Sequence, residues 1–222
     1  GGAGRILAAY YKGAATKEKD NYAIRFQATG DKRAEYFDLK GKAVRKVFLR
    51  APFKRGNFRI SSRFSRRRFH PIKRIYRPHH GVDYAASVGT PIAAIGKGTV
   101  VHAGWKGAYG KCLEIRHTKR YTSRYGHLSK FRVKKGETVE QGQYIGNVGT
   151  TGLSTGPHLH FEMHVNGKQE NFLRLNFPSG KPISAKNIDE FRKVRDQVLV
   201  RLKSEEKKLA TSAKNKSKPV IN

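Results

Sequence analysis

Histidine and aspartate residues in three short segments of this chain have the types and spacing of a metal site. His79 stands four residues before Asp83, within the segment Pro78–Tyr84. Gly81 and the β-branched Val82 disfavour a helix, so the two side chains are expected to converge across a turn that enters a strand. Imidazole and carboxylate both bind zinc, at about 2.0–2.2 Å. A histidine four residues before an aspartate is common, so this pair alone does not establish a site.

The second segment places two histidines two positions apart in a predicted strand. His158 and His160 belong to the run His158–Val165, and side chains at positions i and i+2 of a strand share one face. Both imidazoles are therefore expected to point the same way, and Glu162 and His164 continue that face. The pattern fits a polar, solvent-exposed strand edge as well as it fits a site.

The third segment adds His127 at the end of another predicted strand. A catalytic zinc site needs three protein ligands and an open fourth position for water, and His79, Asp83 and one of the pair His158 and His160 meet that requirement. The metal lowers the pKa of its water towards about 7 and polarises a carbonyl. No His-Glu-x-x-His helix supplies a glutamate base, so unligated imidazoles would have to transfer the proton and stabilise the oxyanion.

Strands are the elements that must position these side chains. Between residues 52 and 180, short runs of strand-forming residues are separated by turns that contain glycine, and Asn166-Gly167 is typical of a type I′ hairpin. The pattern predicts a mainly β fold, with an antiparallel sheet or sandwich as the catalytic domain.

The flanking regions differ from this domain. The pattern of residues 1–51 predicts a β-rich segment. With so few core positions this segment would be only marginally stable alone, so it is expected to be part of an upstream domain or to pack on the adjoining β domain. Residues 181–204 predict an amphipathic helix packed on the β domain or on a partner. Its apolar side chains recur every three or four positions, at Ile188, Phe191, Val194, Val198 and Leu202. Residues 205–222 predict a basic, flexible tail.

The composition indicates an anionic partner and excludes some classes of protein. Lys and Arg number 47 against 16 Asp and Glu, a formal net charge of +31, which suits nucleic acid, an anionic membrane face or an acidic cell-wall polymer. The single cysteine, Cys112, excludes an intramolecular disulfide framework. No apolar run approaches the roughly 20 residues that span a bilayer, so no transmembrane segment is expected.

In combination, the three segments resemble the lysostaphin/LytM-type zinc metallopeptidases, which cut peptide cross-links in bacterial peptidoglycan. The resemblance covers about residues 52–178 and rests on His79-x-x-x-Asp83, on Tyr125–Ser129 and on Gly156–Glu162, in matching order and spacing. Three connecting phrases match as well: Gly89-Thr90-Pro91-Ile92, Gly107-Ala108-Tyr109-Gly110 and Val133-Lys134-Lys135-Gly136. The resemblance implies a fold of the LytM or duplicated-hybrid-motif type.

The resemblance also implies roles for individual residues. It implies that His79, Asp83 and His160 bind one Zn²⁺ per chain, and that His127 and His158 act on the water and the oxyanion.

Further residues are expected around this centre. Glu162 is expected to orient a ligand imidazole from behind, and His164 is expected to be structural. His80, Arg77 and Tyr109 are expected in the substrate groove.

The first fifty residues look like part of the multidomain Gram-negative members of this family, through the phrases Tyr36–Gly41 and Phe48–Pro52. Those members cleave D-alanyl–diaminopimelate cross-links. The implied function is a DD-endopeptidase that cleaves peptidoglycan stem peptides by attack of zinc-bound water. The implied location is the periplasm or cell envelope, with the signal or anchor absent from this chain.

Residues 53–78 hold ten Lys and Arg residues and no acidic residue. This basic run fits either a solvated surface or a groove wall that attracts stem-peptide carboxylates or other anionic wall polymers. With the aromatic residues Phe64, Phe69 and Tyr76 it would also permit nucleic-acid binding. Such a function leaves the His and Asp set unexplained, so no nucleic-acid partner is expected. The alternative function is a non-catalytic, wall-binding activator of other hydrolases on the same fold, against which the complete set of ligands and catalytic histidines argues.

Overall fold

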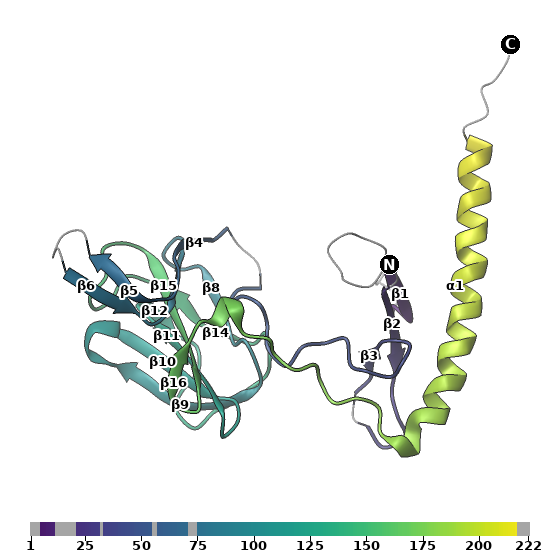
Figure 1. The fold of residues 1–222 in the computed structure, drawn as a ribbon, viewed down its shortest axis with the longest axis horizontal. Helices are drawn as coiled ribbons and strands as arrows, with labels where there is room; N and C mark the ends of the chain where they lie inside the picture. The colour runs from purple at the N-terminus through teal and green to yellow at the C-terminus, as the bar shows by residue number, and fades with distance from the viewer. Residues whose placement is uncertain (1–4, 12–20, 32, 55–56, 71–74, 217–222) are drawn as a thin grey trace, which may run out of the picture. The chain divides into compact units, whose positions relative to one another are not determined.

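The structure is a computed structural model that describes residues 5–11, 21–31, 33–54, 57–70 and 75–216. It divides into two compact units (Figure 1). The larger unit spans residues 47–177, and the smaller unit combines residues from both ends of the chain, 1–46 and 178–222. The described part of the chain contains no helix that is both long and apolar enough to cross a membrane.

The larger unit is built on an eight-stranded sheet. Its strands follow the order β13 (Thr138–Val139), β9 (Gly98–Trp105), β10 (Lys111–Arg116), β11 (Tyr121–Gly126), β15 (His158–Val165), β7 (Val82–Ala85) and β4 (Arg59–Ser62), with β16 (Lys168–Glu170) also paired to β15. A second sheet contains β12 (Leu128–Phe131), β14 (Tyr144–Val148) and β8 (Pro91–Ala93). A hairpin joins β5 (Ser65–His70) to β6 (Ile75–His79). These strand pairs are antiparallel, which confirms the predicted mainly β fold.

The alternation of side chains along the central strands separates the core from the site. Leu113, Tyr125 and Phe161 lie in register across β10, β11 and β15 and are fully buried in the core. Their neighbours along each strand point to the opposite face. On that face Arg124 lies opposite Glu162. Because side chains alternate along each strand, the central sheet has one apolar face in the core and one face that can carry a polar site.

The smaller unit has its own apolar cluster. The antiparallel strands β1 (Ala8–Tyr11), β2 (Asn21–Phe26) and β3 (Glu35–Phe37) pack against helix α1 (Ile188–Lys216). Phe191 of the helix is fully buried, with its ring 5.5 Å from that of Phe26 and 6.0 Å from that of Phe37. The helix therefore packs on the amino-terminal strands, whereas the sequence predicted packing on the β domain or on a partner.

Helix α1 also differs from its predicted bounds of 181–204. It begins at Ile188, after Pro182 and the short 3-10 helix Ala185–Asn187, and it continues to Lys216. Lys, Glu and Ala are strong helix formers, and they dominate the stretch that was predicted to be a flexible tail, residues 205–222. The described part of that stretch, up to Lys216, is helical; residues 217–222 lie outside the described residues.

Candidate metal centre

The three predicted metal ligands come from three strands of the larger unit, two of which are neighbours in the eight-stranded sheet. His79 ends β6, Asp83 lies on β7 and His160 on β15. His160 and Asp83 are direct cross-strand partners. A Cβ atom at Gly81 would lie 2.6 Å from His160 Nε2 and 2.7 Å from the Phe161 carbonyl oxygen. Glycine is therefore the residue that leaves room for the His160 ring between the two ligands of the β6–β7 turn.

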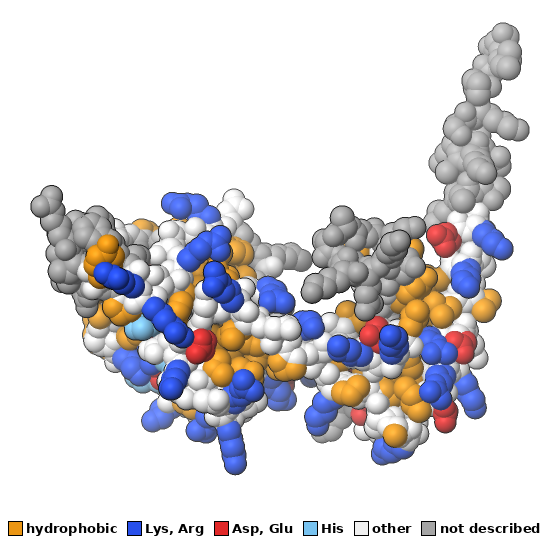
Figure 2. All heavy atoms as spheres, viewed as in Figure 1, with side chains coloured by type: hydrophobic (Ala, Val, Ile, Leu, Met, Phe, Trp, Pro, Cys, Tyr) orange, Lys and Arg blue, Asp and Glu red, His pale blue; other side chains and the backbone are white. Residues whose placement is uncertain are grey.

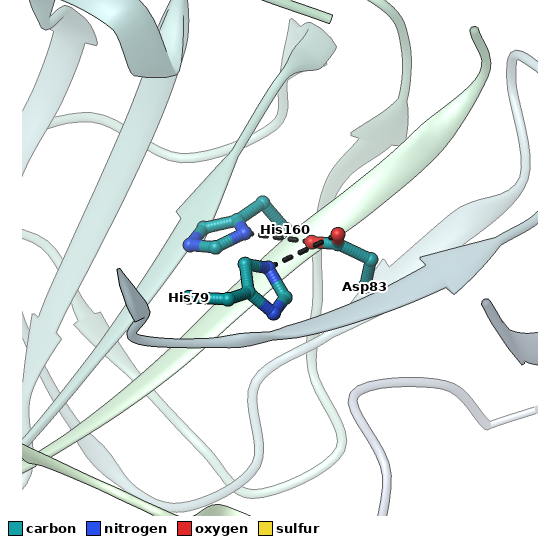
Figure 3. A group of neighbouring side chains, drawn as sticks. All are labelled: His79, Asp83 and His160. Carbon is teal, nitrogen blue, oxygen red and sulfur yellow. Dashed lines mark hydrogen bonds and ion pairs between the residues drawn. The ribbon is translucent and has the colours of Figure 1, made fainter. Parts of the chain in front are cut away.

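The ligand atoms of these residues converge (Figure 3). His79 Nε2 lies 3.0 Å from Asp83 Oδ2, and His160 Nδ1 lies 2.7 Å from Asp83 Oδ1. One ligand atom from each residue lies within 4.8 Å of the other two. Although His79 Nε2 is at ion-pair distance from Asp83, it is buried and makes no hydrogen bond within the described residues. A metal ion would satisfy that nitrogen, and two imidazoles with one carboxylate fit zinc with a fourth position open.

Hydrogen bonds determine which nitrogen of each ligand imidazole is available to a metal. His79 Nδ1 lies 2.9 Å from the Arg63 carbonyl oxygen. A carbonyl only accepts, so Nδ1 donates and Nε2 keeps its lone pair. His160 Nε2 lies 3.1 Å from Glu162 Oε1, and donation to that carboxylate leaves the Nδ1 lone pair on the side of Asp83. The available nitrogens of both histidines therefore face the same carboxylate.

Charges around His160 oppose the effect of burial on its pKa. Burial lowers this pKa, but hydrogen bonds and charge from Asp83 and Glu162 raise it to about 9. Burial raises the pKa of Asp83, but hydrogen bonds and charge from His160 and His79 hold it well below its usual range. A proton and a metal ion compete for His160 Nδ1, because a ligand imidazole must be neutral.

The two predicted catalytic histidines lie beside the predicted metal ligands. The ring centroids of His127 and His158 are 4.6 Å apart, and the His127 ring lies 6.0 Å from that of His160. His127 Nδ1 donates to the Thr151 carbonyl oxygen, and His158 Nδ1 donates to the Gly156 carbonyl oxygen, each over 2.8 Å. Both Nε2 atoms therefore keep a lone pair that can accept a proton.

The backbone of His127 has an uncommon conformation. Its φ angle is 62°, in the left-handed region that few non-glycine residues adopt. Its N–H donates to the Tyr109 carbonyl oxygen over 2.7 Å, while its ring bonds Thr151. A Cβ at Gly110 would lie 2.5 Å from the Thr151 carbonyl oxygen, and one at Gly152 would lie 2.3 Å from Gly110 N. Two loops that touch through these glycines hold His127 in place.

Behind His160, a network of charged side chains surrounds Glu162, which is 1% exposed. Its Oε1 accepts from His160 Nε2 and, over 2.7 Å, from the Tyr109 hydroxyl. Its Oε2 accepts from Arg124 Nη1 over 2.8 Å and from His164 Nε2 over 2.7 Å. Burial raises the pKa of Glu162, but its donors, His160 foremost, hold it well below its usual range. Glu162 is thus a charged carboxylate with two donors on each oxygen.

The three predicted groove residues have different surroundings. His80 is exposed, with its ring 6.1 Å from that of Phe64. Tyr109 has its ring 5.7 Å from that of His160 and gives its hydroxyl to the Glu162 network. Arg77 lies on β6, and its side chain is outside the described residues.

The basic run begins beside a predicted metal ligand. Ser65, at the start of β5, pairs with His79 at the end of β6. Arg66 and Arg67 follow on β5 and are exposed, and the Arg67 guanidinium lies over the Tyr76 ring, 4.3 Å from its centroid. Figure 2 shows Lys and Arg side chains spread over both units of the drawn face, with few acidic ones. The hairpin thus presents exposed positive charges on β5, next to the strand that ends at the predicted ligand His79.

Sequence reasoning missed Arg124 and Glu114. Arg124 lies in the middle of β11, opposite Glu114 on one neighbouring strand and Glu162 on the other. The available indication was the alternation along Tyr121–Gly126, which puts an arginine on the same face as Gly126 and between the buried Ser123 and Tyr125. The Thr151 carbonyl, which orients His127, had no sequence indication because it is a backbone atom.

Comparisons with known proteins agree with this geometry. The model of peptidase family M23 matches residues 77–172. The chain is 40% identical over 173 residues to the peptidoglycan DD-endopeptidase ShyA of Vibrio cholerae, covering 77% of this chain and 40% of ShyA. It is 42% identical over 162 residues to ShyC, a peptidoglycan DD-endopeptidase of the same organism, covering 72% of this chain and 37% of ShyC.

A solved structure that is similar in both sequence and fold can be compared with this chain. It is a crystal structure of a zinc-containing peptidase from Vibrio cholerae, with a TM-score of 0.58 and 33% identity, covering 78% of this chain and 51% of that one. The present chain thus spans about two fifths of ShyA and ShyC and half of this structure. Residues 77–172, which include the predicted ligands and catalytic histidines, form a domain of peptidase family M23.

Proposed function

We propose that this chain is a zinc-dependent endopeptidase that hydrolyses D-alanyl–diaminopimelate cross-links of peptidoglycan. The observation that carries the proposal is the convergence of His79, Asp83 and His160 beside two imidazoles that keep a free Nε2. ShyA and ShyC, which are named peptidoglycan DD-endopeptidases, support the substrate class and the bond. Action on this substrate places the protein in the periplasm or cell envelope.

One zinc ion per chain would be held by His79 Nε2, an Asp83 oxygen and His160 Nδ1. Zinc supplies a Lewis acid for the scissile carbonyl and lowers the pKa of a coordinated water to about 7. Arg63 and Glu162 hold the two ligand imidazoles by hydrogen bonds to their other ring nitrogens. The ligands are thereby oriented before any substrate arrives.

His127 and His158 transfer the proton and stabilise charge. One free Nε2 accepts the proton that the attacking water loses, and the imidazolium returns it to the leaving amine as the C–N bond breaks. The other imidazole donates a hydrogen bond to the oxyanion from Nε2 once that nitrogen is protonated. The carbonyls of Thr151 and Gly156 keep each Nδ1 protonated throughout. Burial is the main cause that lowers the pKa of His127, which favours its neutral, proton-accepting form near neutral pH.

The partner of the basic hairpin is the anionic substrate. Stem peptides carry carboxylates, and the exposed Arg66 and Arg67 lie on the strand that pairs with the segment ending at His79. Coulomb attraction raises the encounter rate of such a substrate with the site. Other anionic wall polymers would be attracted by the same surface.

The experiment that tests this function is digestion of purified Gram-negative peptidoglycan by the zinc-loaded chain, with products separated and weighed by mass spectrometry. Cross-linked dimers are expected to fall and uncross-linked monomers to rise, with no activity for His160→Ala or after chelation. Equal activity of the wild type and His160→Ala would contradict the metal mechanism. An intact substrate in both would favour a non-catalytic activator on the same fold.

A further inference from the structure

Arg124 contacts several polar groups around the predicted metal centre, and the proposed reaction assigns it no role. Its side chain is 14% exposed. Its Nε lies 2.6 Å from Glu114 Oε1, and its Nη1 lies 2.8 Å from Glu162 Oε2 and 2.9 Å from the Tyr109 hydroxyl. The guanidinium also lies over the Tyr109 ring, 4.7 Å from its centroid. One planar group thus contacts two carboxylates and an aromatic ring.

The direction of donation in this network follows from the chemistry of arginine. A guanidinium only donates, so the Tyr109 oxygen accepts from Arg124. The Tyr109 proton then points to Glu162 Oε1, 2.7 Å away. Arg124 therefore acts on Glu162 twice: directly at Oε2 and through Tyr109 at Oε1. Since Glu162 Oε1 is also the acceptor for His160 Nε2, its position determines how the ligand ring is oriented.

The far end of the network is anchored as well. Glu114 Oε1 accepts from Lys106 Nζ over 2.8 Å in addition to Arg124. Lys106 precedes the 3-10 helix Gly107–Tyr109, so the same carboxylate links the strand to the loop that carries Tyr109. Two partly or fully buried carboxylates are in this way placed beside two cations, which is the condition for keeping charges inside a protein.

We infer that Arg124 is a positioning residue for the metal centre, holding Glu162 and Tyr109 so that His160 presents Nδ1 to the zinc ion. This inference rests on the proposed zinc-dependent function. Its role is geometric: the forked guanidinium donates to three acceptors, to one from Nε and to two from Nη1. A lysine ammonium is a compact point charge on a flexible stem, so it replaces the charge without replacing the fork.

The test measures zinc affinity of the full chain directly, by competition with a fluorescent chelator. In Arg124→Met and Arg124→Lys, the zinc dissociation constant is expected to rise about 10- to 100-fold, the range for loss of a group that orients a ligand. Tyr109→Phe removes only the bridging hydroxyl and is expected to raise it about 10-fold. A changed visible absorption of the Co²⁺-substituted variants would mark altered ligand geometry.

Arg132→Met is the matched control. Arg132 also bonds a tyrosine hydroxyl, 3.1 Å away on Tyr144, and lies over that ring, 5.3 Å from its centroid. It has no described hydrogen bond or ion pair with Glu162 or the predicted ligands, so its removal is expected to leave zinc affinity within about 2-fold of wild type. Thermal unfolding of each variant reports on the fold separately.

The outcomes separate this inference from the proposed function. Failure of the wild type to bind zinc would overturn both. Tight binding by the wild type with equal affinities in Arg124→Met, Tyr109→Phe and Arg132→Met would overturn the positioning role alone. If Arg124→Met does not fold, Tyr109→Phe still tests the positioning role. This variant removes one hydroxyl from a partly exposed ring and is expected to fold.

Discussion

His160 and Asp83 are 77 residues apart in the chain, yet His160 Nδ1 lies 2.7 Å from Asp83 Oδ1. Their backbones are direct partners in the antiparallel pairing of β15 with β7. A slip of one residue in that register would turn His160 into the apolar core. The geometry of the predicted metal centre therefore depends on the central sheet, with the β5–β6 hairpin contributing His79.

Loss of a ligand and loss of a catalytic histidine should have separable effects. His79→Ala is expected to contain less than about a tenth of a zinc ion per chain, because two ligands hold the metal weakly. His127→Ala is expected to keep about one zinc ion and to lose turnover about 10²- to 10⁴-fold, the range for general acid–base catalysis. Elemental analysis and peptidoglycan digestion measure the two effects. Loss of metal from both variants would mean that the roles are misassigned.

Gly81 should be required for metal binding because its missing side chain leaves space for His160. A Cβ at this position would lie 2.5 Å from His160 Cε1, and overfilling a close-packed site costs about 1–3 kcal/mol. Gly81→Ala is expected to weaken zinc affinity about 10-fold or more, measured by chelator competition.

Gly104→Ala is the control for this substitution. Gly104 lies on β9 of the same sheet, and a Cβ there would meet only His102, at 3.7 Å, an ordinary contact. This variant is expected to bind zinc like the wild type. Equal weakening in both alanine variants would point to a general effect on the sheet.

The free energy of unfolding should fall in acid because of His117, which is far along the sequence from the predicted metal ligands. Its Nδ1 lies 2.8 Å from the Lys97 carbonyl oxygen and its Nε2 2.8 Å from Ser123 Oγ. Burial lowers its pKa from 6.5 to about 4. Between these values the unfolded chain binds a proton that the folded chain does not, so stability is full above pH 6.5 and falls as pH drops towards 4. The loss is expected to reach about 3 kcal/mol.

Urea unfolding of the wild type and His117→Gln at pH 7, 5.5 and 4.5 measures this loss. The variant is expected to be less stable at pH 7, because it disturbs a buried network, but to lose less stability on acidification. Parallel pH curves for the two proteins would exclude His117 as the cause.

The basic hairpin should speed the encounter with peptidoglycan in a salt-dependent way. Arg66→Glu with Arg67→Glu is expected to lower kcat/KM on sacculi at low salt, and the deficit should shrink as salt rises, because the Debye length falls to about 10 Å at 0.1 M. Lys193→Glu with Lys203→Glu, at exposed positions of α1, makes the same change in net charge. An equal effect of both double variants, or none at any salt, would contradict local steering.

The sequence yields predictions for the reacting groups of the site but none for Arg124, which contacts their supporting network. His79, Asp83, His127, His158 and His160 could be predicted because their spacing along turns and strands is a local property of the chain. Arg124 could not be assigned a partner, since its contacts to Glu114 and Glu162 depend on the order of strands in the sheet. Strand order is a long-range property that local patterns do not determine.

The carboxyl-terminal helix shows the same difference between local features, which the sequence predicts, and long-range contacts, which it does not. The apolar stripe that includes Phe191 predicted its existence and its buried face. Its packing partner was missed, because Phe26 and Phe37 lie more than 150 residues away along the chain. Its end was placed too early, since the stretch after Leu202 has few large apolar residues but is rich in helix-forming Lys, Glu and Ala.

The most direct test of the proposed metal centre is X-ray diffraction from zinc-grown crystals of the full chain, collected on both sides of the zinc absorption edge. One anomalous peak per chain is expected, about 2.0–2.2 Å from His79 Nε2, an Asp83 oxygen and His160 Nδ1. His127 and His158 are expected to stand outside the ligand set. A fully zinc-loaded crystal with no peak at these three residues, or with a peak held by other side chains, would contradict the proposed centre.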